Sequence, residues 1–362
     1  MTTPATKKMI RAYYEQRPLK MFLQSLFQSP PENFHKSEKV EWEVERDGEE
    51  VAVAIKDYST GYRNNTADEY TAKELVPPAY KESFRLHVYD QMKKQSGKVD
   101  TDDPDFQAAA TAKSFKNYRR IEKKIRRAIE LQCGQILTTG QLDLKDENGN
   151  TIYAIDFKPK AAHFFSAGTA WNAASPTIEA NIMTAAQLVR NNTGLDADEI
   201  IMDENSWVAA KNNADFMKIF DYRRADFGSL GENGNKYANT GATYHGRIQI
   251  GAYWYSIYTY DKTYTDPETG NTSRFLPSAK CVVRASEGRL DLTFGYVPNF
   301  RPIASQALRF LPGRMSSRAQ GMDMFPNAWL SLDGEAMFAG LASRPCAIPT
   351  AIDSFACIST GV

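Results

Sequence analysis

The stretch from Lys113 to Leu137 constrains the fold most, because its apolar residues recur at the spacing of an α-helix. Those residues are Phe115, Tyr118, Ile121, Ile125, Ala128, Ile129, Cys133, Ile136 and Leu137. The pattern predicts one long helix with a single buried stripe, which we call the spine helix. Gly140 can adopt the left-handed conformation that often ends a helix, and a strand pattern follows it.

Basic residues dominate the other faces of the spine helix and are opposed only by Glu122 and Glu130. Lys and Arg neutralise phosphates without reading bases, so this strip is a candidate contact for nucleic acid. A solvated face whose charges pair with acidic neighbours explains the pattern equally well. We therefore expect a basic strip that faces either DNA or a neighbouring subunit, formed by Lys116, Arg119, Arg120, Lys123, Arg126 and Arg127.

The composition is that of a globular protein without a strong overall field. The chain has 362 residues, of which 42% are hydrophobic, enough for one large or two ordinary domains. Basic and acidic residues both number 44, so no overall field steers the chain towards nucleic acid or a membrane, and self-association is permitted. The four cysteines lack CxxC spacing, and neither a signal peptide nor a membrane-spanning run is present. We expect buried free thiols in a reducing cytoplasm.

The N-terminal segment, Met1 to Ser37, alternates basic and apolar groups. Phe22, Leu26 and Phe27 lie at helical spacing in a piece that is too short to be stable alone, and Pro30-Pro31 ends it. This pattern predicts an arm docked on the body or on a neighbouring subunit. A helix packed on its own domain is the alternative.

From Lys39 the hydrophobic period changes to two, which predicts a β-hairpin with its turn at Asp47-Gly48 and its second strand at Val51 to Ile55. The polar stretch from Lys56 to Lys73 then returns through Leu75 to Tyr80 into an extended segment that ends near Val88. So long a connection is uncommon in a compact domain. We expect a two-stranded loop that reaches off the body, followed by a linker from Lys93 to Asp105.

Beyond the spine helix the pattern becomes that of a second, α/β domain, followed by a short tail. An Asn-Gly turn at residues 146–150 predicts a hairpin. The helices expected next are Thr177 to Asn191, stopped by Gly194, and Glu204 to Asn213, on either side of a buried strand at Glu199 to Met202. Strands are expected within Arg247 to Tyr260, Phe275 to Val283 and Leu290 to Tyr296. The tail is expected to hold a helical piece at Glu335 to Leu341 and strands at Cys346 to Pro349 and Phe355 to Ser359.

The sequence contains no phosphate-binding loop, dinucleotide fingerprint, HExxH or GxSxG motif. The acidic turn before Thr151 fails as a calcium loop, because Leu144 and Ile155 occupy ligand positions. The Tyr-rich run around Trp254 is typical of a two-sided strand. The four histidines are isolated in sequence: His35, His87, His163 and His245. We therefore predict no catalysis, no cofactor and no metal.

An arm, a long excursion, a spine helix, a hairpin, an α/β domain and a short return follow one another in the order of HK97-like capsid proteins of tailed phages. The chain resembles the major capsid protein family of bacteriophage lambda over most of residues 35–362. The segments that carry the resemblance are Glu38-Lys39-Val40, Val76-Pro77-Pro78-Ala79-Tyr80-Lys81, Asp221-Tyr222-Arg223-Arg224, Phe275-Leu276-Pro277 and Phe325-Pro326-Asn327-Ala328-Trp329.

The resemblance implies an α+β, HK97-like fold with five parts. They are an N-terminal arm (1–38), a β-hairpin and E-loop (39–92), a P-domain with the spine helix (93–165), an A-domain (166–310) and a return to the P-domain (311–362). The inter-subunit contacts it implies for the arm and E-loop are Phe22, Phe27, Lys56, Tyr58, Tyr62, Tyr70, Lys73, Pro77, Pro78 and Tyr80. The A-domain contacts it implies are Asp221, Arg223 and Arg224.

The implied function is structural. Hexamers and pentamers of the chain would close an icosahedral head around double-stranded DNA, bound by non-specific contact, with the host cytoplasm as the place of assembly and the virion as the destination. A scaffolding protein, a portal protein and in some members a decoration protein are the further partners. Neither Lys56 nor Lys73 aligns with the crosslinking lysine of some relatives, so we predict no isopeptide bond. The alternatives are an encapsulin-like compartment shell and an unrecognised enzyme.

Overall fold

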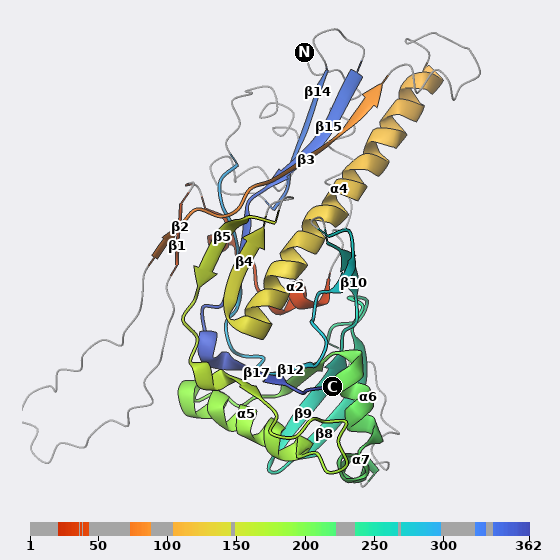
Figure 1. Cartoon of the computed structure of the whole chain (residues 1–362). Helices are drawn as coiled ribbons and strands as arrows, with labels where there is room; N and C mark the ends of the chain where they lie inside the picture. Colours follow the sequence, from red (N-terminus) through yellow and green to blue (C-terminus); the bar gives the residue numbers. More distant parts are fainter. Residues whose placement is uncertain are drawn as a thin grey trace, which may run out of the picture.

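The computed structural model describes residues 21–35, 37, 39–42, 73–87, 104–145, 149–221, 236–266, 269–297, 323–330 and 336–362. Its longest element is the helix α4 (Pro104–Thr139), which confirms the predicted spine helix (Figure 1). The helix begins at Pro104, within the expected linker, because the first helical turn tolerates a residue without an N–H. It ends where Gly140 takes a φ of 67°. The predicted stripe from Tyr118 to Leu137 is buried.

A three-stranded antiparallel sheet lies along the N-terminal half of α4 (Figure 1). Its order is β14 (Phe325–Leu330), β15 (Ala336–Ser343) and β3 (Tyr80–His87). Ala339 and Leu341 of β15 are buried. The helix expected at Glu335 to Leu341 is therefore wrong. Apolar and small residues occupy both faces of this strand, which hides its two-residue period.

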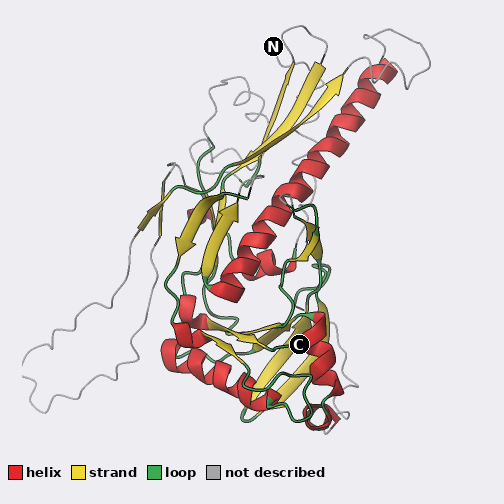
Figure 2. Ribbon diagram, in the orientation of Figure 1, coloured by secondary structure: helices red, strands yellow, loops and turns green. Residues whose placement is uncertain are grey.

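A six-stranded mixed sheet lies beyond the C-terminal end of α4 (Figure 2). Its strands, in spatial order, are β6 (Phe164–Ser166), β17 (Phe355–Ser359), β12 (Lys280–Arg284), β7 (Glu199–Met202), β9 (Tyr253–Thr259) and β8 (Thr243–Ile250). The helices α5 (Ile178–Thr193), α6 (Glu204–Asn212) and α7 (Ala214–Asp221) accompany it. The predicted strand β7 and helices α5 and α6 are confirmed, and Gly194 ends α5 with a φ of 65°.

The six-stranded sheet is apolar on both faces, because each face packs on a different helix. Ile200 and Val283 lie in one core cluster with Ile182 and Val189 of α5. Ile201 and Val282, the adjacent residues in the same two strands, lie in the cluster that contains the spine helix. This alternation explains why β7 reads as a continuous apolar run.

The last strand of the chain joins segments that are distant in sequence. Strand β17 lies between β6 and β12 in the six-stranded sheet, and its Phe355 and Cys357 are in the core cluster of the spine helix. Likewise, β13 (Asp291–Phe294), from the range expected for the A-domain, pairs with β16 (Pro345–Ile348). Strand pairing between segments so far apart in sequence depends on tertiary packing, which local patterns do not record.

The described part of the chain also holds three smaller strand pairs, one of which joins β10 (Thr263–Thr265) and β11 (Thr272–Arg274). β4 (Gln141–Lys145) and β5 (Thr151–Asp156) form the predicted hairpin. β1 (Val40–Trp42) pairs with β2 (Lys73–Leu75), whereas the turn and second strand expected from Asp47 to Ile55 lie outside the described residues. The remaining short elements are α2 (Phe22–Leu26), η1 (Pro31–Asn33), η3 (Ala161–His163) and η6 (Ile352–Ser354).

The four cysteines are buried and unpaired, as predicted. Burial raises the pKa of the Cys346 thiol to about 12, so this thiol is protonated and unreactive at neutral pH. No helix in the described part of the chain is long and apolar enough to cross a membrane.

Candidate assembly surfaces

The basic strip of α4 is exposed along the half of the helix that carries it. Lys116, Arg119, Arg120, Lys123 and Arg127 are all exposed, as the helical pattern predicted. Arg126 is the exception, since only 4% of this residue is exposed. Its guanidinium pairs with Asp323 at 2.5 Å and lies 3.9 Å from Glu122. The expectation for Arg126 is therefore wrong: it joins α4 to the segment that leads into β14.

Glu130 also departs from the expected exposed face. It is fully buried, and its carboxylate accepts hydrogen bonds from the backbone N–H groups of Leu23 and Gln24, both at 2.8 Å. The hydroxyl of Tyr260 donates a third bond at 2.6 Å. Burial raises the pKa of Glu130, and these hydrogen bonds oppose that shift. The carboxylate thus connects three elements: the arm, the spine helix and the end of β9.

Helix α2 depends on Glu130 because its own residues offer no side-chain cap. A five-residue helix leaves its first N–H groups without intrahelical partners, and the carboxylate accepts two of them. The positive end of the helix also favours a negative group there.

The described part of the arm packs on its own chain. Met21, Phe22, Leu23, Leu26 and Phe27 are buried in the core cluster of the spine helix. The ring of Phe22 lies 5.2 Å from those of Tyr237 and Tyr260, centroid to centroid. The inter-subunit role expected of Phe22 and Phe27 is therefore wrong, and the alternative of a helix packed on its own domain is confirmed for this segment. Residues 1–20 lie outside the described residues.

The return from the excursion also makes contacts within the chain. Pro77 is buried, and a Cβ added at Gly295 would approach its ring to 3.1 Å. The Tyr80 hydroxyl accepts a hydrogen bond from Gln132 at 2.8 Å, and burial raises the pKa of Tyr80 to about 12. Both residues therefore make contacts within their own chain, and the inter-subunit role expected of them stays a prediction. Pro78 is half-buried.

The other expected contacts of the excursion and the A-domain are not placed by the structure. Lys73 lies in β2 and Asp221 at the end of α7, but their side chains lie outside the described part. The same is true of the whole of Lys56, Tyr58, Tyr62, Tyr70, Arg223 and Arg224.

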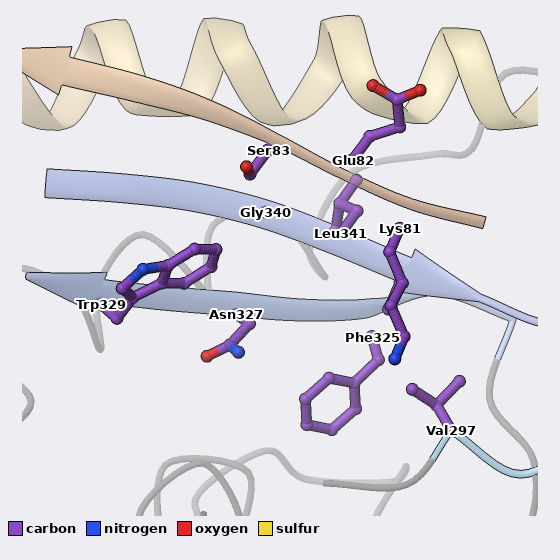
Figure 3. A pocket seen from close by; sticks show the side chains of 10 residues that line it. Lys81, Glu82, Ser83, Val297, Phe325, Asn327, Trp329, Gly340 and Leu341 are labelled. Atoms are coloured by element: carbon purple, nitrogen blue, oxygen red, sulfur yellow. The ribbon is translucent and has the colours of Figure 1, made fainter. Parts of the chain in front are cut away.

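A shallow pocket lies on the face of the three-stranded sheet that points away from α4 (Figure 3). Trp329 stacks on Phe338 at 5.2 Å, and a Cβ added at Gly340 would meet the indole at 3.2 Å. Phe325, Asn327 and Lys81 continue the lining. No local sequence pattern indicated this surface, because it forms only when β14, β15 and β3 pair in register.

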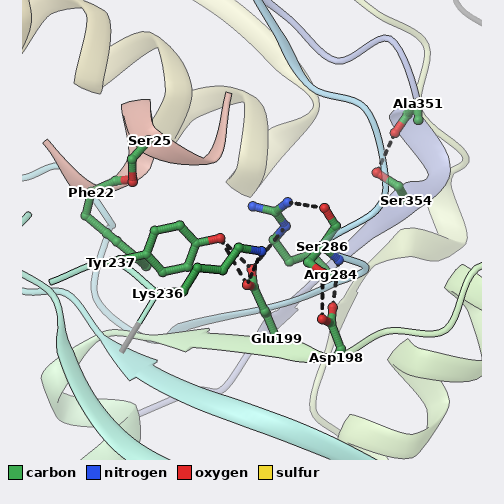
Figure 4. A network of polar contacts seen from close by, with 10 residues as sticks. All are labelled: Phe22, Ser25, Asp198, Glu199, Lys236, Tyr237, Arg284, Ser286, Ala351 and Ser354. Carbon is green, nitrogen blue, oxygen red and sulfur yellow. Dashed lines mark hydrogen bonds and ion pairs between the residues drawn. The ribbon is translucent and has the colours of Figure 1, made fainter. Parts of the chain in front are cut away.

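A buried polar network ties residues 236–237 to the six-stranded sheet (Figure 4). Glu199 of β7 accepts a hydrogen bond from the Tyr237 hydroxyl at 3.0 Å. Arg284 of β12 and Lys236 lie 3.6 and 3.5 Å from the same carboxylate. The network joins the sheet to the segment that follows residues 222–235, so its role in the described structure is to position that segment.

Two of the four histidines, His163 and His245, have structural partners in the described part of the chain, and two tyrosines of the Tyr-rich run are placed as well. His163 is buried, with Nδ1 2.8 Å from the carbonyl oxygen of Phe355 and Nε2 2.7 Å from Asn192. His245 stacks on Trp207 at 4.1 Å. Tyr255 and Tyr258 are buried on opposite sides of β9, which confirms the predicted two-sided strand.

Comparison with solved structures shows the fold. A putative capsid protein of a prophage of E. coli CFT073 is 18% identical, with a TM-score of 0.64 over 96% of this chain and 94% of that one. The capsid of Ralstonia phage GP4 is 11% identical, with a TM-score of 0.51 over 92% and 88%. These likenesses confirm the α+β, HK97-like capsid fold.

No curated protein matched the chain. The sequence profile described as phage major capsid protein E matches residues 5–358, nearly the whole length. That match confirms the family expected from the resemblance, and the chain belongs to the phage major capsid protein E family.

Proposed function

We propose that this chain is the repeating subunit of an icosahedral phage head, in which hexamers and pentamers enclose double-stranded DNA. The observation that carries the proposal is the family match across residues 5–358. Family membership and the capsid fold make the protein a structural component of the virion and not an enzyme. They also favour a phage capsid over an encapsulin-like compartment.

The shape of the subunit suits closed rings. The spine helix and its three-stranded sheet form an elongated layer, and the six-stranded sheet lies at one end of it (Figure 1). We assign the layer to contacts at the periphery of each ring and the six-stranded sheet to contacts around the axis, with Asp221, Arg223 and Arg224 among the latter. Heterologous contacts repeated by rotation close into rings.

The excursion supplies the contacts that connect neighbours in this proposal. Strands β1 and β2 pair Val40 with Leu75, so residues 43–72 leave and re-enter the body at one place. We propose that Lys56, Tyr58, Tyr62, Tyr70, Lys73 and Pro78 contact the adjacent subunit. Each contact can be as weak as about 4 kcal/mol, a millimolar affinity, because a shell makes many contacts at once.

The remaining partners follow from the family. A scaffolding protein and a portal protein are the proposed partners, with the host cytoplasm as the place of assembly. A decoration protein is a further candidate for the outer surface.

Electron microscopy of the purified chain, expressed alone and with its scaffolding protein, tests the proposal. We expect closed shells of uniform size that contain nucleic acid after packaging. Protein cargo in place of nucleic acid would favour the encapsulin-like compartment. A chain that stays monomeric in sedimentation experiments at every concentration, with the scaffolding protein present, contradicts a shell function altogether.

A further inference from the structure

Four cations of the basic strip form one continuous face of α4. Lys116, Arg120, Lys123 and Arg127 are spaced by four, three and four residues, so they lie within about 60° of one another around the helix axis. They extend over about 16 Å of the helix at 1.5 Å per residue. All four are exposed, and none forms an ion pair or hydrogen bond with another residue of the described structure. We call this set the cationic face.

The cationic face points away from the three-stranded sheet. Tyr118 of α4, on the opposite side of the helix, donates a hydrogen bond to the Asn327 carbonyl oxygen of β14 at 2.8 Å. Lys124 and Arg126, on the two flanks, pair with Glu82 and Asp323 at the sheet edges. The cationic face and the Trp329 surface are therefore on opposite sides of one thin layer, and in a shell one of them faces the interior.

Glu122 and Glu130 of the spine helix do not pair with the cationic face. Glu130 is buried in its bonds to the arm, and Glu122 lies beside Arg126. A face that stays cationic in this way fits an extended polyanion.

We infer that the cationic face binds the phosphate backbone of the packaged duplex DNA, which places α4 on the inner side of the shell. This inference rests on the proposed function and names which side of the layer meets the DNA. The contact is independent of base sequence and weakens with salt, because Lys and Arg displace counterions condensed on the duplex. The sheet surface around Trp329 then faces outwards.

The test compares binding of random-sequence duplex DNA by the purified full chain across a series of salt concentrations. A variant with Lys116→Gln, Arg120→Gln, Lys123→Gln and Arg127→Gln removes the cationic face. Each lost phosphate contact reduces the slope of log affinity against log salt by about 0.9, so the slope should become shallower by about 3 to 4. Lys124→Gln is the matched control on the same helix, because its charge is already paired with Glu82, and it should leave the slope unchanged.

The same variants are examined for shell formation by electron microscopy. Wild-type shells, intact variant shells and a shallower slope support the inference. An unchanged slope in the quadruple variant overturns the inference. If the quadruple variant forms no shells while the wild-type and Lys124→Gln chains do, the inference is also overturned, because the cationic face would then be a contact between subunits. Absence of shells from the wild-type chain counts against the proposed function instead. If the quadruple variant fails to fold, the single variants Lys123→Gln and Lys124→Gln are compared in the same salt series. The inference then predicts that the slope becomes shallower by about 1 for Lys123→Gln and stays unchanged for Lys124→Gln.

Discussion

Phe22 offers the sharpest test of how the arm is held, because its burial within one chain opposes the inter-subunit role that its sequence context suggests. The side chain is fully buried and contacts the rings of Tyr237, Tyr258 and Tyr260. Replacing a fully buried Phe by Ala costs about 3–5 kcal/mol, from lost apolar burial and the cavity left behind. The loss of the aromatic contacts is part of that cost.

Phe22→Ala should therefore lower the free energy of unfolding of the unassembled chain by about 3–5 kcal/mol. Urea denaturation followed by tyrosine fluorescence measures this change. The matched control is Phe84→Ala, because Phe84 is 37% exposed and its loss should cost only about 1–2 kcal/mol.

Measuring the unassembled chain separates packing of Phe22 within its own chain from packing on a neighbouring subunit. In an unassembled chain no neighbour is present, so a ring that packs on another subunit would contribute nothing to stability. A change below about 1 kcal/mol for Phe22→Ala, together with shells that assemble poorly, would refute the intra-chain packing described here. Faster proteolysis within residues 21–35 is the second readout, because α2 loses the anchor that holds it on α4.

Three further predictions follow from single contacts. Burial raises the pKa of Glu130 in the folded chain above its ordinary value of 4.5. The stability of the wild-type chain relative to Glu130→Gln should therefore be greatest below pH 4.5 and should fall as the pH rises through the folded-state pKa. Denaturant midpoints of both chains across a pH series measure this difference. Gly134→Ala should destabilise the chain by about 1–3 kcal/mol, because the new Cβ would lie 2.3 Å from the Phe275 carbonyl oxygen. Helix propensity alone would instead raise the melting temperature, so a higher melting temperature of the variant would contradict this packing. Arg126→Gln should cost about 1–3 kcal/mol because it removes the guanidinium that pairs with Asp323 and lies 3.9 Å from Glu122, and the half-exposed Asp323 keeps the loss moderate. An unchanged calorimetric transition would count against this anchor.

Several features could be predicted from the sequence because each depends on neighbours along the chain. The helical period of Tyr118 to Leu137 identified α4, since one buried stripe is enough to reveal a helix. Gly140 and Gly194 end their helices with positive φ, a conformation that other residues adopt at a cost. The Asn-Gly turn before Thr151 predicted the β4–β5 hairpin for the same local reason.

Other features depended on segments far apart in the chain. Glu130 and Arg126 look like ordinary members of a charged helix face, yet Leu23, 107 residues away in sequence, donates to the first, and Asp323, 197 residues away, pairs with the second. The pairing of β1 with β2 and the insertion of β17 between β6 and β12 have the same origin. The hydrophobic period of a helix or strand shows which of its faces is apolar. Which residues cover its other faces depends on tertiary packing. The sequence by itself thus determined the spine helix and its stops, and only the tertiary structure decided which of its charges stay in solvent.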